Sequence, residues 1–102
     1  MAEVKIINGI KVTVATDYAE MSRIATSIIL ERVRKNPNLN ILVPAGTTPE
    51  GVYGILSNDE PKLFRKVTFF NMDEYCEKKD GEYKVVSEKD SKGYRYYMRK
   101  LF

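Results

Sequence analysis

Residues 41–49, ILVPAGTTP, join an apolar run to a turn of small residues and then to a proline. The β-forming run at 41–43 predicts a buried strand, and Pro49 suits the first position of a helix, because its missing N–H would have no partner there. Gly46 can adopt backbone conformations closed to other residues. Since unpaired N–H groups near a helix N-terminus attract anions, Gly46, Thr47 and Thr48 form a candidate phosphate cradle.

The segment before this stretch predicts a strand followed by a helix. We place the strand at Lys11–Ala15. Asn8-Gly9 could close a two-residue hairpin, but we favour an interruption at the entry to a single strand. A helix then starts at Asp17, which can cap it, with Glu20 bonding back in a capping box. Asn36-Pro37 ends the helix. Its apolar stripe consists of Met21, Ile24, Ala25, Ile28, Ile29 and Val33.

A second helix and a third strand follow. The helix runs from Pro49 to about Leu56, and its two glycines, Gly51 and Gly54, indicate close packing against a sheet or room for a ligand. Residues 57–66 are a connection. Val67–Phe70 is the third strand, and it ends in the sequence NMDEY at residues 71–75.

The remainder is polar up to Lys92 and then helical. Asp80-Gly81 is a turn, and Tyr83–Val86 is a short strand. A helix begins at Gly93 and is still in progress at Phe102. One face of this helix carries Tyr94, Tyr97, Met98 and Leu101.

Short alternation of strands and helices predicts an α/β fold, with a Rossmann-like parallel sheet, flanking helices and right-handed crossovers. Ligands bind outside the carboxyl ends of such strands, so residues 44–48 and 71–75 should face one crevice. A phosphate cradle beside Asp73 suits a sugar phosphate: the cradle anchors the substrate, and the carboxylate moves a proton next to a carbonyl.

Composition narrows the alternatives. The chain has 102 residues, 43% of them hydrophobic and 30% charged, as expected for one globular domain. A net charge of +3 is too small to argue for nucleic acid, and no secretory or membrane segment is found. A single cysteine, Cys76, favours a reducing cytoplasm, and no neighbouring base suggests that it is a nucleophile. Aromatic and basic residues alternate at 94–100, where an amphipathic helix is a simpler explanation than single-stranded nucleic acid.

Two segments resemble a known family. VPAGTTP at 43–49, with Tyr53 after it, and VTFFNMDEY at 67–75 are similar to signature segments of glucosamine-6-phosphate deaminases, within the wider deaminase and 6-phosphogluconolactonase superfamily. Gly93-Tyr94, with Met98 and Phe102, resembles the start of the helix that follows in that family. The likeness extends from about Asp17 onward.

The resemblance implies roles for four residues. Gly46, Thr47 and Thr48 hold the substrate phosphate, and Asp73 shuttles the C2 proton. We also expect Ala45 and Glu74 to be supporting residues, with Glu74 mainly structural as a hydrogen-bond acceptor in its loop. The implied reaction opens an amino-sugar ring, isomerises aldose to ketose and releases ammonia to give fructose 6-phosphate. It implies no redox cofactor and no catalytic metal, a phosphorylated amino sugar as ligand, and neither nucleic acid nor membrane as partner.

The chain departs from the family in its missing histidine. The family's ring-opening His and its basic residues for the far side of the phosphate lie in later segments, and this chain has no His. Residues 1–102 therefore resemble the N-terminal part of a sugar-phosphate isomerase/deaminase-like α/β domain, inactive alone. The segment from Cys76 to Ser91 also differs from the short family loop. Exposed sheet edges favour a homo-oligomer or a C-terminal portion. Hydrolysis of a phosphosugar lactone and non-catalytic sugar-phosphate sensing remain alternatives.

Overall fold

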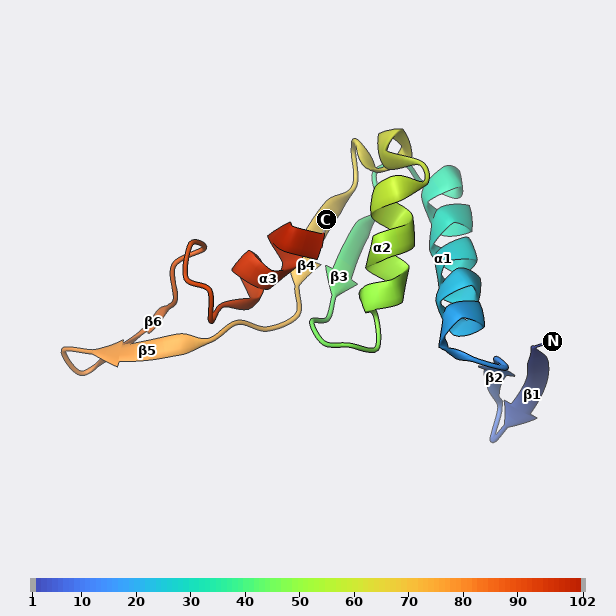
Figure 1. The fold of residues 1–102 in the computed structure, drawn as a ribbon, viewed down its shortest axis with the longest axis horizontal. Coiled ribbons are helices and arrows are strands. Elements are labelled where there is room, and N and C mark those ends of the chain that lie inside the picture. Colours follow the sequence, from blue (N-terminus) through green and yellow to red (C-terminus); the bar gives the residue numbers. More distant parts are fainter. Residues whose placement is uncertain (1, 102) are drawn as a thin grey trace.

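A computed structural model describes residues 2–101 (Figure 1). The elements are β1 (Glu3–Ile7), β2 (Ile10–Val14), α1 (Tyr18–Lys35), β3 (Asn40–Val43), α2 (Glu50–Asn58), the 3₁₀ helix η1 (Pro61–Phe64), β4 (Thr68–Asn71), β5 (Cys76–Lys79), β6 (Glu82–Val85) and α3 (Tyr94–Leu101). The molecule measures 53 × 33 × 23 Å, with a radius of gyration of 16.4 Å. A compact domain of this length has about 13 Å. The elongation arises because the β1–β2 and β5–β6 hairpins project from opposite ends (Figure 1).

Strands β3 and β4 form the centre of the fold. They pair in parallel, from Asn40 opposite Thr68 to Val43 opposite Asn71. One further hydrogen bond, from the Met72 N–H to the Val43 carbonyl oxygen at 3.1 Å, extends the ladder beyond the last strand residues. The two predicted strands are confirmed, with boundaries shifted by one residue. The loops that follow them leave the sheet at the same edge.

A parallel sheet larger than β3 and β4 is not confirmed within residues 2–101. β1 pairs antiparallel with β2, from Glu3 opposite Val14 to Ile7 opposite Ile10. Asn8 and Gly9 have φ values of 50° and 79°, and positive φ at both central residues is what the favoured two-residue hairpin turn requires. The hairpin alternative is therefore correct. The N-terminal strand joins its own neighbour, and the parallel sheet is limited to β3 and β4.

Helix α1 begins and ends as predicted. The Asp17 carboxylate accepts a hydrogen bond from the Glu20 N–H at 2.8 Å. The Glu20 carboxylate accepts in return from the Thr16 N–H at 3.0 Å, one residue before the cap. Asn36 ends the helix, and its N–H donates to the Arg32 carbonyl oxygen. These bonds satisfy donors that a helix start otherwise leaves unpaired.

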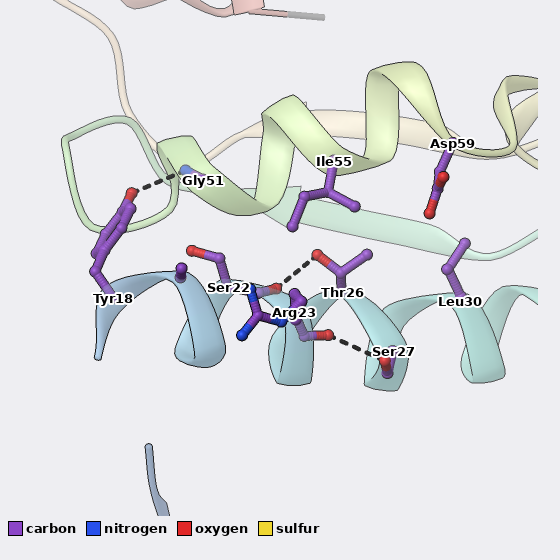
Figure 2. A pocket seen from close by; sticks show the side chains of 10 residues that line it. Tyr18, Ser22, Arg23, Thr26, Ser27, Leu30, Gly51, Ile55 and Asp59 are labelled. Carbon is purple, nitrogen blue, oxygen red and sulfur yellow. Dashed lines mark hydrogen bonds between the residues drawn. The ribbon is translucent and has the colours of Figure 1, made fainter. Parts of the chain in front are cut away.

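The predicted apolar stripe of α1 is confirmed in part. Val33 is buried at 1% exposure, and Ala25 and Ile29 pack against the apolar cluster between α1 and α2, whereas Ile28 is 53% exposed. The helix also buries Ser22, Thr26 and Leu30, which the predicted stripe omits. The physical reason is that α1 packs closely against α2 (Figure 2), since a Cβ added at Gly51 would lie 2.3 Å from the Ser22 hydroxyl oxygen. Small side chains therefore belong to the buried face as well.

Two apolar clusters hold the helices in place. Leu30, Val52 and Leu56 form one between α1 and α2, with the η1 side chains packed against it. Val43, Tyr53 and Met98 form the other, which joins β3, α2 and α3. Tyr97 and Leu101 also pack on this second cluster, so the predicted α3 face is confirmed as far as Leu101. Phe102 lies outside the described residues.

The segment between β4 and α3 forms a second hairpin. Asp80 and Gly81 both have positive φ, 53° and 79°, which confirms the predicted turn. The strand predicted at Tyr83–Val86 is β6, one residue earlier. Cys76 is exposed at the start of β5, with a free thiol. Within residues 2–101, no helix combines the length and apolar character needed to cross a membrane.

Two alanine substitutions in α2 should act in opposite directions. Nothing lies within 4 Å of a Cβ added at Gly54, so Gly54→Ala should stabilise the fold by about 0.5–1 kcal/mol through helix propensity. At Gly51 the added Cβ meets Ser22 and the Tyr18 ring, so Gly51→Ala should destabilise by about 1–3 kcal/mol. Urea unfolding of both variants measures the difference. Stabilisation by both would contradict the close contact between α1 and α2.

Candidate active site

The loop between β3 and α2 depends on one unusual backbone conformation. Gly46 has a φ of 122°, in the region that side chains rarely adopt. The loop then makes a turn, in which the Glu50 N–H donates to the Thr47 carbonyl oxygen at 3.3 Å. Helix α2 starts at Glu50 rather than at Pro49, and Pro49 precedes it without any side-chain cap. Gly46, Thr47 and Thr48 are exposed, as an anion-binding loop must be.

The loop has free hydrogen-bond donors. Within residues 2–101, the N–H groups of Gly46, Thr47 and Thr48 donate to no protein acceptor. They lie immediately before the N-terminus of α2, where the helix dipole favours negative charge. Thr47 and Thr48 add two hydroxyls. This arrangement can bind a phosphate group.

A hollow of about 370 Å³ adjoins the loop. Gly46, Thr47 and Glu50 line one side of it. The other side is contributed by the segment before α3 and by α3 itself: Tyr75, Ser91, Lys92, Gly93, Tyr94 and Tyr97. Ala45, Thr48, Asp73 and Glu74 are not among the lining residues. The structure thus brings two of the predicted phosphate ligands to the hollow directly.

A tyrosine pair lines the hollow beside the acidic loop. The hydroxyls of Tyr75 and Tyr94 are 3.3 Å apart, and their rings pack with centroids 4.9 Å apart. The hydrogen bond with Tyr75 raises the pKa of Tyr94. Asp73, two residues before Tyr75, is exposed and does not itself line the hollow.

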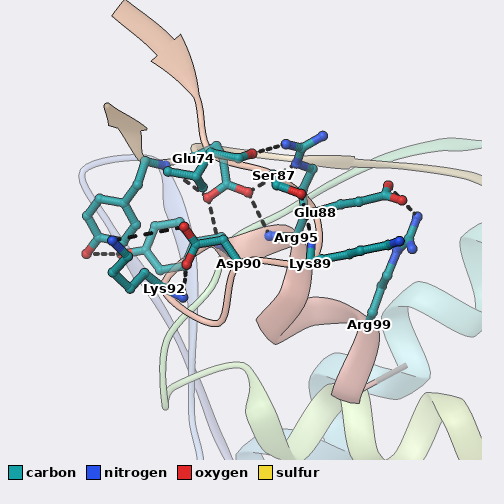
Figure 3. A network of polar contacts seen from close by, with 11 residues as sticks. Glu74, Ser87, Glu88, Lys89, Asp90, Lys92, Arg95 and Arg99 are labelled. Carbon is teal, nitrogen blue, oxygen red and sulfur yellow. Dashed lines mark hydrogen bonds and ion pairs between the residues drawn. The ribbon is translucent and has the colours of Figure 1, made fainter. Parts of the chain in front are cut away.

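Glu74 has a structural position at the start of α3 (Figure 3). One carboxylate oxygen accepts from the N–H of Tyr94 at 2.6 Å and of Tyr75 at 2.9 Å. The other accepts from the Arg95 N–H at 2.8 Å and from its Nε at 3.3 Å. Burial of Glu74 alone would raise its pKa, but these hydrogen bonds together lower the pKa below its ordinary value. Glu74 caps α3 as a carboxylate.

The cap leaves no room beside Glu74. A Cβ added at Gly93 would lie 2.9 Å from Val86 and 3.3 Å from the Glu74 carboxylate. Arg95 also donates from its guanidinium to the Val86 carbonyl oxygen, which ties the second hairpin to α3. This explains why glycine precedes α3.

Lys92, Tyr94 and Tyr97 are among the lining residues of the hollow that sequence reasoning did not identify as site residues. Lys92 lines it and lies 3.4 Å from Glu77, but its polar neighbourhood has no periodicity that would single it out. Tyr94 and Tyr97 were assigned to the core face of a helix. The sequence did contain a signal for these two tyrosines, because a tyrosine on an apolar helix face carries a hydroxyl that needs a polar partner.

Other candidate sites lack the predicted residues. A hollow of about 590 Å³ between α1 and α2 contains none of them (Figure 2). Among residues 2–101, no group of three or more His, Cys, Asp or Glu side chains is arranged to hold a metal ion.

Comparison with known proteins identifies relatives of this chain. It is 39% identical over 88 residues to the glucosamine-6-phosphate deaminase of Bacillus velezensis, and this alignment covers 83% of this chain and 33% of the relative. It is 35% identical over 95 residues to the glucosamine-6-phosphate deaminase of Clostridium acetobutylicum, and that alignment covers 90% of this chain and 36% of the relative. No model of a protein family matches the chain.

A solved structure, described as a monomeric glucosamine-6-phosphate deaminase, is also similar. Its TM-score is 0.72 at 28% identity, over 86% of this chain and 34% of that chain. The resemblance found in the two motifs is confirmed over most of the described fold. The chain spans about a third of the length of the relatives it matches.

The Glu74 cap predicts an acid-sensitive fold. Because its pKa is lower in the folded chain, Glu74 contributes full stability above the ordinary value of 4.5, and this contribution is lost as the pH falls through the lowered pKa. Glu74→Gln should therefore cost about 0.5–2 kcal/mol at pH 7, as the loss of a helix cap does, and should flatten the decline below pH 4.5. Urea unfolding between pH 7 and 3 measures both, with Glu82→Gln in the exposed strand β6 as control. Parallel curves for Glu74→Gln and the wild type would contradict this role.

Proposed function

We propose that this chain supplies the phosphate-binding loop and the proton-transferring carboxylate of a glucosamine-6-phosphate deaminase. In this proposal residues 1–102 are the N-terminal part of a larger α/β domain, whose other residues complete the reaction. The observation that carries the proposal is the parallel pairing of β3 with β4, since it brings the two family-like loops to one edge of the sheet.

The substrate phosphate binds to the β3–α2 loop. The phosphate oxygens accept hydrogen bonds from the free N–H groups of Gly46, Thr47 and Thr48 and from the two threonine hydroxyls. Lys92, which lines the hollow beside the loop, adds a positive charge whose field attracts the phosphate. Ala45 supports the loop from its first half.

Asp73 transfers the proton. In an aldose–ketose isomerisation, a base takes the C2 proton and C1 gains one, after which water releases ammonia from the resulting imine. Glu74 does not suit this task, because its carboxylate is occupied by the N-terminus of α3. Asp73 is exposed, so a substrate can reach its carboxylate, and it suits this task better.

The proposal includes a larger Rossmann-like sheet, of which β3 and β4 are one part. β3, α2 and β4 form the repeating unit of a Rossmann-like parallel sheet. The register partners Leu42 and Phe70 are 62% and 52% exposed on one face of this pair, which supports a sheet face completed by further polypeptide. That cover is either a C-terminal portion or another subunit. The relatives, all deaminases in the comparisons above, favour this reaction over lactone hydrolysis.

A chimera tests the proposal. Residues 1–102 replace the matching third of the Bacillus velezensis deaminase, and turnover of glucosamine 6-phosphate is measured. Asp73→Asn should lower kcat by about 10²- to 10⁴-fold with a small change in KM, since the phosphate loop is intact. Asp80→Asn, in the β5–β6 turn, is the matched control and should leave both constants unchanged. Full turnover by Asp73→Asn would exclude Asp73 as the base, and a folded chimera that binds the sugar phosphate without turnover would favour a sensing role.

A further inference from the structure

Three tyrosine hydroxyls reach the phosphate-binding loop from three different helices. Tyr18, the first residue of α1, donates to the Thr47 carbonyl oxygen at 2.7 Å. The same hydroxyl accepts from the Gly51 N–H at 2.8 Å, in the first turn of α2 (Figure 2). Tyr18 thus joins the end of the loop to the start of the helix.

The second and third hydroxyls act on the other half of the loop. Tyr53 on α2 donates to the Pro44 carbonyl oxygen, and its side chain lies in the core at 3% exposure. Tyr97 on α3 donates to the Glu50 carboxylate and lies 3.2 Å from the Gly46 carbonyl oxygen. The Tyr97 hydroxyl is thus within hydrogen-bonding reach of both the Glu50 carboxylate and the Gly46 carbonyl oxygen.

Peptide geometry links these carbonyls to the free amides. In a trans peptide the C=O of one residue points opposite to the N–H of the next, and no cis peptide occurs within the described residues. Tyr97 therefore fixes the direction of the Thr47 N–H through the Gly46 carbonyl. Tyr18 likewise fixes the Thr48 N–H through the Thr47 carbonyl. Both amides point away from the tyrosines, and neither has an acceptor among residues 2–101.

We propose that Tyr18 and Tyr97 are positioning residues that aim the Thr47 and Thr48 N–H groups at the substrate phosphate, with Tyr53 anchoring the start of the loop. This inference rests on the proposed function of the loop. Loss of either positioning hydroxyl leaves one peptide plane free to rotate. Phosphate binding must then order that plane, and the lost conformational entropy weakens the affinity.

The protonation state of Tyr97 supports its role. The hydrogen bond to Glu50, together with burial, raises the pKa of Tyr97 to about 12. Its hydroxyl therefore stays a donor at any pH at which the protein works. The same bond holds the Glu50 carboxylate, which lines the hollow, in a fixed place beside the loop.

The experiment uses the 102-residue chain labelled with ¹⁵N. Inorganic phosphate and glucosamine 6-phosphate are titrated separately, while the amide signals of residues 46–48 are followed. Tyr18→Phe and Tyr97→Phe should each raise the Kd of both ligands about three- to tenfold, the size expected for one lost hydrogen bond. Tyr83→Phe, at a 75% exposed position in β6, is the control and should leave Kd unchanged.

A second measurement separates positioning from general stability. Amide order parameters in the free chain should fall at Thr48 in Tyr18→Phe and at Thr47 in Tyr97→Phe, from values near 0.85 toward about 0.6, while the rest of α2 is unchanged. Unaltered order parameters in both variants would overturn the proposal, whatever their melting temperatures. A wild-type chain that binds neither ligand would count against the phosphate-binding role of the loop, and the order parameters would still decide whether the tyrosines position it.

Discussion

The parallel pairing of β3 with β4 is the constraint on which the site depends. Because the strands run in the same direction and end in register, Val43 opposite Asn71, the residues that follow them diverge from one edge. The Met72 N–H still pairs with the Val43 carbonyl oxygen, so the two loops separate only after that bond. An antiparallel pair would send the glycine-containing loop and the acidic loop to opposite ends of the sheet. The pairing is thus what makes a shared hollow possible.

The two neighbouring carboxylates of the acidic loop perform different tasks. Glu74 is nearly buried, with four hydrogen bonds, and it fixes the N-terminus of α3. Helix α3 in turn carries Tyr94 and Tyr97 to the hollow. Asp73 is exposed, so it remains accessible to a substrate. Under the proposed function, replacing Asp73 would affect proton transfer, whereas replacing Glu74 would loosen the helix that lines the hollow.

The sequence predicted features that depend on near neighbours. The Asp17 cap, the helix end at Asn36 and the Asp80-Gly81 turn all follow from side chains within a few residues of the element they control. It did not anticipate the burial of Ser22 and Thr26, because that burial follows from the close approach of α2 at Gly51, far along the chain. It also favoured the wrong alternative at Asn8-Gly9, because a two-residue turn and an interrupted strand both suit those residues locally.

The candidate site shows the same division. Gly46, Thr47 and Asp73 were predicted because local motifs resemble a known family, and Tyr53 belongs to one of those motifs. Tyr18 and Tyr97 instead reach the loop from distant helices, which no local pattern contains. Tyr18 also takes up the Gly51 N–H, and the Glu50 N–H donates to the Thr47 carbonyl oxygen, so these two first-turn donors of α2 are already satisfied. The loop itself offers the N–H groups of Gly46, Thr47 and Thr48. Three packed helices hold that loop by its carbonyls, so under the proposed function its affinity for a phosphate would depend on the tertiary fold as much as on its own residues.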